Sequence, residues 1–171
     1  MAKMRWLSRD EERAWRGYRR MHTLLDLQIG RDLFSDSALS DADYDVLSTL
    51  TESRDKSWRA SELAKHLSWS TSRLAHHVGR MERRGLVRRD NCVEDGRGAT
   101  IVLADAGWAV LQEAAPRHVA SVRRNFIDLL TPSELQSLVI ISEKVINQLV
   151  DPVQPKPIAR TMRDDVDPLS R

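Results

Sequence analysis

The side chains best suited to chemistry lie in the middle of this chain, where hydroxyl groups are followed by basic and imidazole groups at helical spacing. In order they are Ser70, Thr71, Ser72, Arg73, His76 and Arg80. Short hydroxyl side chains at a helix start can approach phosphates together with the free backbone amides. Arg73 offers the paired donors that recognise guanine, while His76 and Arg80 would reach base edges and phosphate. This order indicates a helix that enters the major groove of duplex DNA.

A turn-forming segment further along supplies a second candidate contact. Residues 86–103 consist of an apolar run, a Gly-rich polar tip and a second apolar run, which predicts a β-hairpin. Arg97 at the tip would reach a neighbouring minor groove, and Asp95 would hold it in position. Alone, such a turn is ordinary, and a cationic helix face is common in proteins that never touch DNA. The combination of the cationic helix with the β-hairpin is a more specific indication of DNA binding than either feature alone.

Helical patterns precede these contacts. Ser8 and Glu11 have the spacing of a capping box, and the apolar stripe after them predicts a helix over residues 9–33. That stripe consists of Trp15, Tyr18, Met21, His22, Leu25 and Ile29. Ser40 and Asp43 repeat the capping pattern before a second helix of about three turns.

Two shorter helical patterns form the centre of the chain. Residues 61–67 indicate a short helix, whereas residues 58–60 are too few to form a strand alone. Residues 70–84 indicate a second helix, and Gly85 stands where a helix needs a left-handed residue to end. The inward stripe of this second helix is Leu74, His77, Val78 and Met81. Its opposite stripe is Arg73, His76 and Arg80.

The remaining third of the chain is predicted to be helical before it becomes irregular. Residues 111–130 and 132–149 indicate two helices, the second with Pro132 at its first position. Residues 151–171 have little periodicity and three prolines among the first seven, so we expect a tail that is mobile or lies along the surface. The fold class predicted is mostly α with a small β-hairpin wing.

Composition limits the class of protein. Hydrophobic residues make up 41% and charged residues 30%, the balance of a folded helical protein, and no apolar stretch approaches the roughly 20 residues of a membrane span. The N-terminus lacks the apolar segment of a signal peptide, so we expect a cytoplasmic protein. The net charge is only +2, yet residues 59–97 hold nine Lys and Arg against five acids. The positive charge is concentrated where the DNA contacts are predicted.

Four segments resemble the successive motifs of the MarR family of bacterial transcriptional regulators. They are ASELAKHL (60–67), MERRGLVR (81–88), DGR (95–97) and LADAG (103–107). The resemblance covers about residues 10–150 and implies a winged helix-turn-helix in a triangular homodimer, each lobe reading half of a palindromic operator, with repression expected rather than activation. Carried over by position, it makes the six central residues groove and phosphate contacts, and Asp95 and Arg97 the wing pair.

The same resemblance implies a division of the chain. Residues 1–36 and 108–150 would form dimerisation helices, residues 37–107 the DNA-binding domain, and residues 151–171 a Pro-containing tail. Two positions depart from the family pattern. Ala104 stands where the family usually has Thr, which weakens the cap of the next helix unless Asp105 replaces it. His77 occupies a position that is commonly aliphatic.

An enzyme is the main rival class. The groups available for catalysis or metal binding are His22, His66, His76, His77, His118 and Cys92. Their spacing gives no His-Glu-x-x-His, no phosphate loop after a strand and no cysteine pair for zinc. We therefore predict no catalytic residue, no metal and no cofactor. Cys92, the single cysteine, excludes an intramolecular disulfide and is more simply structural than redox-active.

A small-molecule effector and a protein partner are two further alternatives. The family often binds aromatic or phenolic effectors in a crevice between the dimerisation helices and the DNA-binding lobe. Candidate lining residues are Trp15, Met21, His22, Tyr44 and Trp108. Apolar residues at helical spacing are core more often than pocket. A winged helix can also bind other proteins, or act as an architectural DNA binder without a ligand. A protein-binding face would carry apolar groups, which the outer stripe lacks.

Overall fold

The computed structural model describes residues 4–91 and 99–149. The elements are α1 (Arg9–Ser37), α2 (Asp41–Leu50), β1 (Ser57–Arg59), α3 (Ala60–His66), α4 (Thr71–Arg83), β2 (Val87–Asn91), β3 (Ala99–Leu103), α5 (Asp105–Asn125), the 3-10 helix η1 (Ile127–Leu129) and α6 (Pro132–Leu149). The chain is therefore mostly helical, with a small antiparallel sheet that includes the predicted hairpin strands β2 and β3.

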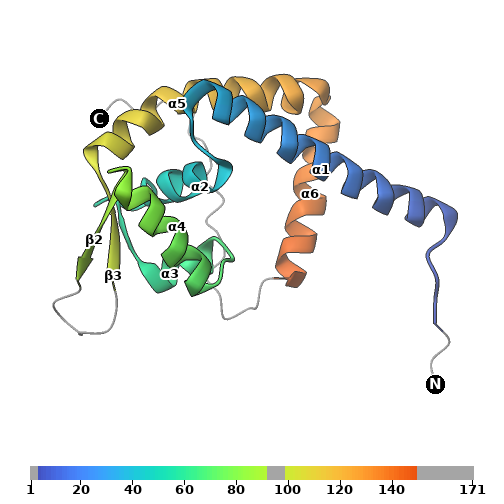
Figure 1. The fold of residues 1–171 in the computed structure, drawn as a ribbon. Coiled ribbons are helices and arrows are strands. Elements are labelled where there is room, and N and C mark those ends of the chain that lie inside the picture. Colours follow the sequence, from blue (N-terminus) through green and yellow to red (C-terminus); the bar gives the residue numbers. More distant parts are fainter. Residues whose placement is uncertain (1–3, 92–98, 150–171) are drawn as a thin grey trace.

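The helices divide into a lobe and a set of long helices around it. Figure 1 shows α1 and α5 side by side above a lobe formed by α2, α3, α4 and the sheet. From the end of α5 the chain turns into α6, which runs down beside the lobe, and the N-terminal half of α1 extends away from everything else. The arrangement matches the winged helix-turn-helix with added terminal helices that the sequence predicts.

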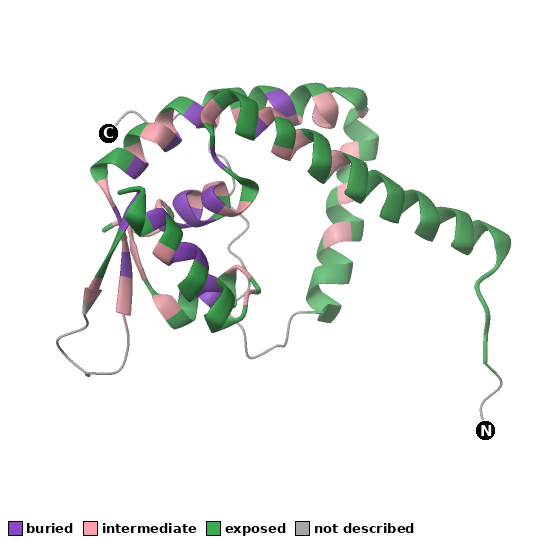
Figure 2. Ribbon diagram, viewed as in Figure 1, coloured by how far each residue is buried: buried purple, intermediate pink, exposed green. Residues whose placement is uncertain are grey.

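The hydrophobic core lies in the lobe. Figure 2 shows the buried positions concentrated there, while the first half of α1 and most of α6 are exposed. The side chains with no exposed surface are Leu39, Val46, Leu47, Leu50, Leu63, Val78 and Met81. The predicted inward stripe of α4 is confirmed, because all four of its residues are buried. In contrast, α1 buries only Leu33, and α6 buries no residue.

Both predicted capping boxes are present. The Ser8 hydroxyl accepts from the Glu11 amide at 3.3 Å, and the Glu11 carboxylate accepts from the Ser8 amide at 2.7 Å. Ser40 and Asp43 repeat this exchange at the start of α2. However, α1 continues past the predicted end at residue 33 and ends at Ser37, where Ala38 adopts a left-handed φ of 54°. No glycine marks this end, so the sequence pattern stopped too early.

Residues 57–59 form a strand, β1, although the sequence pattern there is too short to predict a strand alone. Three residues, Ser57 to Arg59, pair antiparallel with β3, with Trp58 opposite Ile101. The sheet order β1-β3-β2 makes β3 the central strand. So short a strand is stable only because it pairs with β3. That partner lies more than forty residues later in the chain, so the local sequence does not reveal the pairing.

The end of α4 sets the direction of the wing. Gly85 has a φ of +72°, and its amide donates to Glu82 O at 2.9 Å, while the Leu86 amide donates to Met81 O at 3.0 Å. These two bonds form the Schellman motif expected at a left-handed glycine. The helix therefore ends abruptly and β2 begins at Val87, which confirms the predicted stop.

The helix predicted at residues 111–130 begins and ends earlier. It is α5, at residues 105–125, followed by η1. The Ala104 side chain makes no capping bond, which leaves Asp105 in the first turn as the polar group at the start of α5. Close backbone packing also explains the start: the Ala104 amide donates to Leu86 O at 3.1 Å, and a Cβ on Gly107 would lie 2.0 Å from the same oxygen.

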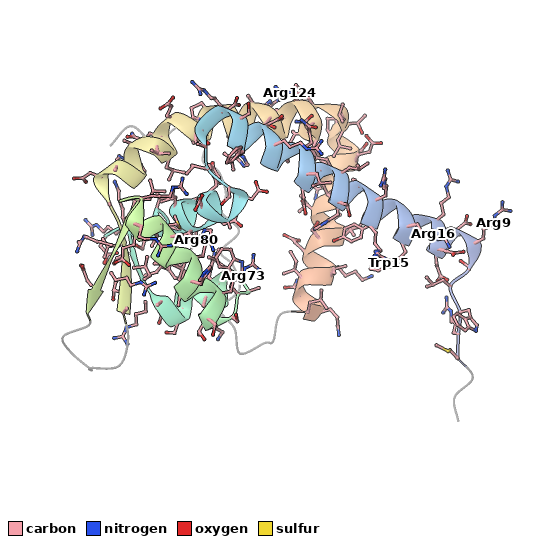
Figure 3. All side chains as sticks on the ribbon, viewed as in Figure 1. Arg9, Trp15, Arg16, Arg73, Arg80 and Arg124 are labelled. Carbon is pink, nitrogen blue, oxygen red and sulfur yellow. The ribbon has the colours of Figure 1, made fainter. Side chains whose placement is uncertain are left out.

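One carboxylate joins α1 to α5. Asp32 Oδ2 accepts from the Ser121 hydroxyl at 2.6 Å, from Arg124 Nη2 at 2.8 Å and from the side-chain Nδ2 of Asn125 at 3.1 Å. Ser121 is buried, and Arg124 lies on the upper side of α5 (Figure 3). These charge-assisted bonds fix how the two long helices lie against each other.

Candidate nucleic-acid interface

The start of α4 is suited to an anion. Ser70 is the N-cap residue, and its hydroxyl accepts from the Arg73 amide at 3.1 Å. The first turn contains no acidic residue, and Thr71 and Ser72 are exposed. Free amides and the positive end of the helix dipole therefore point to solvent beside three hydroxyl groups. The structure brings the predicted hydroxyl cluster together at one helix end.

The outward face of α4 differs from the predicted stripe. At 100° per residue, the positions opposite the buried Leu74, Val78 and Met81 belong to Ser72, His76, Gly79 and Arg83. Arg83 is exposed and was missed by the sequence analysis, although its spacing from Ser72 and His76 could have revealed it. Arg73 and Arg80 lie on the edge of this face rather than at its centre.

Arg73 is held by an aromatic ring. Its guanidinium lies 4.2 Å from the centroid of Trp69, a half-buried residue in the turn between α3 and α4. A guanidinium over an indole gains cation–π attraction and loses rotamer freedom. Figure 3 shows Arg73 and Arg80 on the same helix. Arg73 was predicted from the sequence as a DNA contact, whereas Trp69 had no predicted role.

Arg80 lies between two imidazoles. Its Nη1 is 2.8 Å from His76 Nδ1, and its Nη2 is 2.7 Å from His77 Nδ1. His77 is buried, with its ring edge-on to Trp69 at 5.4 Å between ring centroids. Burial lowers the pKa of His77, with contributions from the charges of Arg80 and Arg73, and Asp43 opposes the change.

Asp43 connects the start of α2 to α4. Its Oδ2 accepts from Arg84 Nη1 at 2.7 Å and from the Ser40 amide at 3.0 Å. Its Oδ1 lies 3.1 Å from His77 Nε2, within range of electrostatic attraction although not aligned for a hydrogen bond. Burial alone would raise the pKa of Asp43, but the hydrogen bonds from Arg84 and Ser40 outweigh it, and the pKa is lowered.

A basic residue of β2 ties the hairpin to α4. Arg89 Nη2 donates to Ala75 O at 2.6 Å, and the Arg89 amide donates to the Glu82 carboxylate at 3.2 Å. The hairpin therefore has a defined direction relative to α4. The predicted tip contacts Asp95 and Arg97, and Cys92, lie outside the described residues.

A crevice separates the lobe from the long helices. A cavity of about 370 Å³ lies between α1, α2 and α5, and its lining is Asp26, Ile29, Leu33, Asp41, Tyr44, Asp45, Ser48 and His118. The Tyr44 and His118 rings are 4.2 Å apart, centroid to centroid. Burial raises the pKa of Asp41, and the neighbouring Asp26 raises it further. The crevice thus combines an aromatic wall with carboxylates.

Of the five predicted effector contacts, only Tyr44 lines this crevice. Trp108 lies elsewhere, with Lys56 Nζ 3.7 Å from its ring centroid. Trp15, Met21 and His22 lie on the exposed part of α1, where His22 is 3.2 Å from Asp26. The structure does not gather the five into one site. His118 was not predicted as a lining residue, because its position opposite Tyr44 depends on the packing of α5 on α2.

In residues 4–91 and 99–149, no three side chains of His, Cys, Asp or Glu gather as a metal site would require. Over the same residues, no helix combines the length and apolar character needed to cross a membrane.

Comparison with known proteins places this geometry among transcriptional regulators. A model of the MarR family matches residues 39–98. The HTH-type transcriptional regulator PecS of Dickeya dadantii (strain 3937) is 29% identical over 114 residues, which are 66% of this chain and 66% of that regulator. The matched stretch is thus just under two thirds of either protein.

Solved structures give closer matches. AbsC, a MarR family transcriptional regulator from Streptomyces coelicolor, is 41% identical with a TM-score of 0.82, over 85% of this chain and 98% of that one. Sco3205, a MarR family regulator of the same organism solved in complex with DNA, is 38% identical with a TM-score of 0.84, over 91% of this chain and 95% of that one.

Proposed function

This chain belongs to the MarR family of DNA-binding transcription regulators, and we propose that it binds a palindromic operator as a homodimer through α4 and the β2–β3 wing. The observation that carries the proposal is the start of α4, where Ser70, Thr71 and Ser72 surround free amides beside Arg73. Sco3205, similar over nearly the whole chain, was solved with DNA, which supports the same use of this surface here.

Each part of α4 has a separate role in this proposal. The hydroxyl groups and amides at its start contact phosphate, and Arg73 donates to a guanine edge in the major groove. His76 faces the bases, while Arg80 and Arg83 contact phosphates further along the duplex. Because phosphate contacts dominate, the affinity falls steeply as salt rises.

The wing completes each half-site. Arg89 directs β2 along α4, and Arg97, held in position by Asp95, would enter the minor groove beyond. Minor-groove potential is strongest over A·T stretches, so Arg97→Ala should weaken binding mainly to duplexes with A·T flanks. Equal weakening on every flank would contradict this assignment.

Exposed apolar surface supports the homodimer. The large apolar side chains exposed on α6 are Val139, Ile140, Ile141, Val145, Ile146 and Leu149. Trp15, Tyr18 and Leu24 expose about half of their surface on α1. Large apolar side chains that gather on exposed helices in this way are usually covered by a partner. Residues 1–36 and 108–150 would thus be dimerisation segments and residues 37–107 the DNA-binding domain, with 151–171 as a tail.

A dimer seated on its operator occupies duplex that RNA polymerase needs, so the expected effect on an adjacent promoter is repression. An effector would act through the crevice lined by Tyr44 and His118, because a ligand there changes how the lobe sits under α1 and α5. The carboxylates of Asp26, Asp41 and Asp45 favour an aromatic compound that is neutral or cationic. A rise in unfolding temperature with tyramine but not with salicylate would support this chemistry; the reverse would contradict it.

The test of DNA binding is a selection of genomic fragments by the purified full chain at two salt concentrations. Enrichment of an inverted repeat whose half-sites lie about one helical turn apart would support a dimeric, sequence-specific regulator. Binding without an enriched motif would indicate an architectural protein. Absence of binding even at low salt would favour a protein-interaction module.

A further inference from the structure

The buried imidazole of His77 faces Arg80, one of the proposed phosphate contacts, rather than filling the core as an aliphatic side chain would. We propose that His77 is a positioning residue that, with Asp43 behind it, holds the Arg80 guanidinium in place for DNA. This inference rests on the proposed function, because it assigns a role to His77 within the same DNA-binding surface.

The donor and acceptor roles follow from the chemistry of the guanidinium. Arginine can only donate, so His77 Nδ1, 2.7 Å from Arg80 Nη2, must be an unprotonated acceptor. The ring proton is therefore on Nε2, the nitrogen that lies 3.1 Å from the Asp43 carboxylate. A neutral ring in this tautomer satisfies Arg80 on one side and is attracted to Asp43 on the other.

The exposed His76 completes the arrangement on the other side of Arg80. Its Nδ1 lies 2.8 Å from Arg80 Nη1, so the two imidazoles occupy two of the five guanidinium N–H groups. Three N–H groups are then left for a phosphate, as far as the described residues show. A side chain already held in one conformation loses less entropy when DNA binds.

Protonation of His77 would undo this arrangement. A proton on Nδ1 removes the acceptor and places a positive charge against Arg80. The other groups around the ring are Asp43 on α2, which favours protonation, Arg73 on α4, which opposes it, and the uncharged Trp69 ring. Positioning of Arg80 should therefore be present at neutral pH and be lost in acid.

Two substitutions of His77 separate positioning from packing. Asparagine places an amide oxygen near the former Nδ1, so His77→Asn keeps the Arg80 acceptor but cannot titrate. Glutamine reaches instead toward the former Nε2, so His77→Gln keeps a donor for Asp43 and removes the acceptor. The probe is a fluorescent mixed-sequence duplex at low salt, since a phosphate contact is independent of sequence. Unfolding temperatures of both variants check that they fold.

We expect His77→Gln to weaken binding by about threefold to tenfold, and His77→Asn to stay within about twofold of the unsubstituted protein. In the Arg80→Ala background, His77→Gln should have no further effect, because its role passes through Arg80. As the pH falls through the lowered pKa of His77, which burial places below the ordinary histidine value, the unsubstituted protein should lose affinity relative to His77→Asn. The ratio of the two affinities removes the effect of the other groups that gain a proton in acid, because both proteins contain those groups.

The outcomes distinguish this inference from the proposed function. No binding of the duplex by the unsubstituted protein would overturn the proposed function and the inference with it. Two results would overturn the inference alone. In one, His77→Gln and Arg80→Ala weaken binding additively. In the other, His77→Asn weakens binding as much as His77→Gln does. Nitrogen NMR of the unsubstituted protein without DNA needs no variant: a His77 proton on Nδ1 at neutral pH would also overturn it.

Discussion

Arg84, at the C-terminal end of α4, donates from Nη1 to Asp43 Oδ2 across 2.7 Å, so the end of α4 is tied to the start of α2. Asp43 is only 4% exposed, and its carboxylate also caps α2. This bond sets the position of α4 relative to the long helices, because α2 contacts both α4 and α5. The start of α2 and the position of the proposed DNA-binding helix therefore depend on one buried carboxylate.

Asp43→Asn should reduce the free energy of unfolding at pH 7 by about 1.5–3 kcal/mol, because a charged hydrogen-bond acceptor is lost inside the lobe. Because the pKa of Asp43 is lowered in the folded protein, its ionised form contributes to the free energy of unfolding. This contribution is complete above about pH 4, the pKa of an Asp in an unfolded chain, and is lost as the pH falls through the pKa of Asp43 in the folded protein. Urea unfolding between pH 7 and pH 2.5 measures this loss, which the variant should lack. Asp36→Asn, an exposed position on α1, is the matched control. An identical acid loss in both variants would contradict the role of Asp43.

Gly107→Ala should destabilise the fold by about 1–3 kcal/mol, because the new methyl group has no room. Its Cβ would lie 2.0 Å from Leu86 O, a backbone atom that cannot move without shifting β2. Gly17→Ala is the control, since no atom lies within 4 Å of its Cβ. That change should stabilise α1 by about 0.5–1 kcal/mol. Equal effects of the two substitutions in urea unfolding would refute the packing argument.

Arg73→Ala should relax sequence preference at one base pair in each half-site, at a cost of about 1–3 kcal/mol for the preferred base. Trp69→Leu should give a smaller loss at the same base pair, because it removes the ring that holds the guanidinium. A panel of duplexes with single base changes measures both. Arg83→Ala is the comparison, expected to weaken all duplexes alike through a lost phosphate contact. If Arg73→Ala behaved in the same uniform way, Arg73 would not be a base contact.

Ile146→Glu should shift the protein from dimer toward monomer, because it places a charge among the exposed apolar side chains of α6. Affinity for a palindromic duplex should fall with it, since one lobe reads only half of the site. Ser133→Glu introduces the same charge in the first turn of α6, where the neighbours one turn on, Gln136 and Ser137, are polar, and should leave the dimer intact. Sedimentation of the full chain compares them. An unsubstituted protein that sediments as a single chain would argue against the dimer.

The local signals in the sequence determined most of the elements that position the DNA contacts. The capping pairs at Ser8 and Ser40 predicted two helix starts, and the helical spacing of Leu74, Val78 and Met81 predicted the inward face of α4. Gly85 predicted the end of that helix. These features depend on neighbouring residues and backbone preference alone, so a sequence pattern is enough to read them.

Tertiary structure decided what depends on residues far apart in the chain. Strand β1 exists because β3 pairs with it, and α5 begins where Gly107 lets the helix approach Leu86. Likewise, His77 occupies a core position in the sequence pattern, but its contacts with Asp43 and Arg80 were not predictable. Helical periodicity predicts on which face of a helix a side chain lies, but it does not predict which residue of another element that side chain contacts. The partner is fixed only when separate elements pack together.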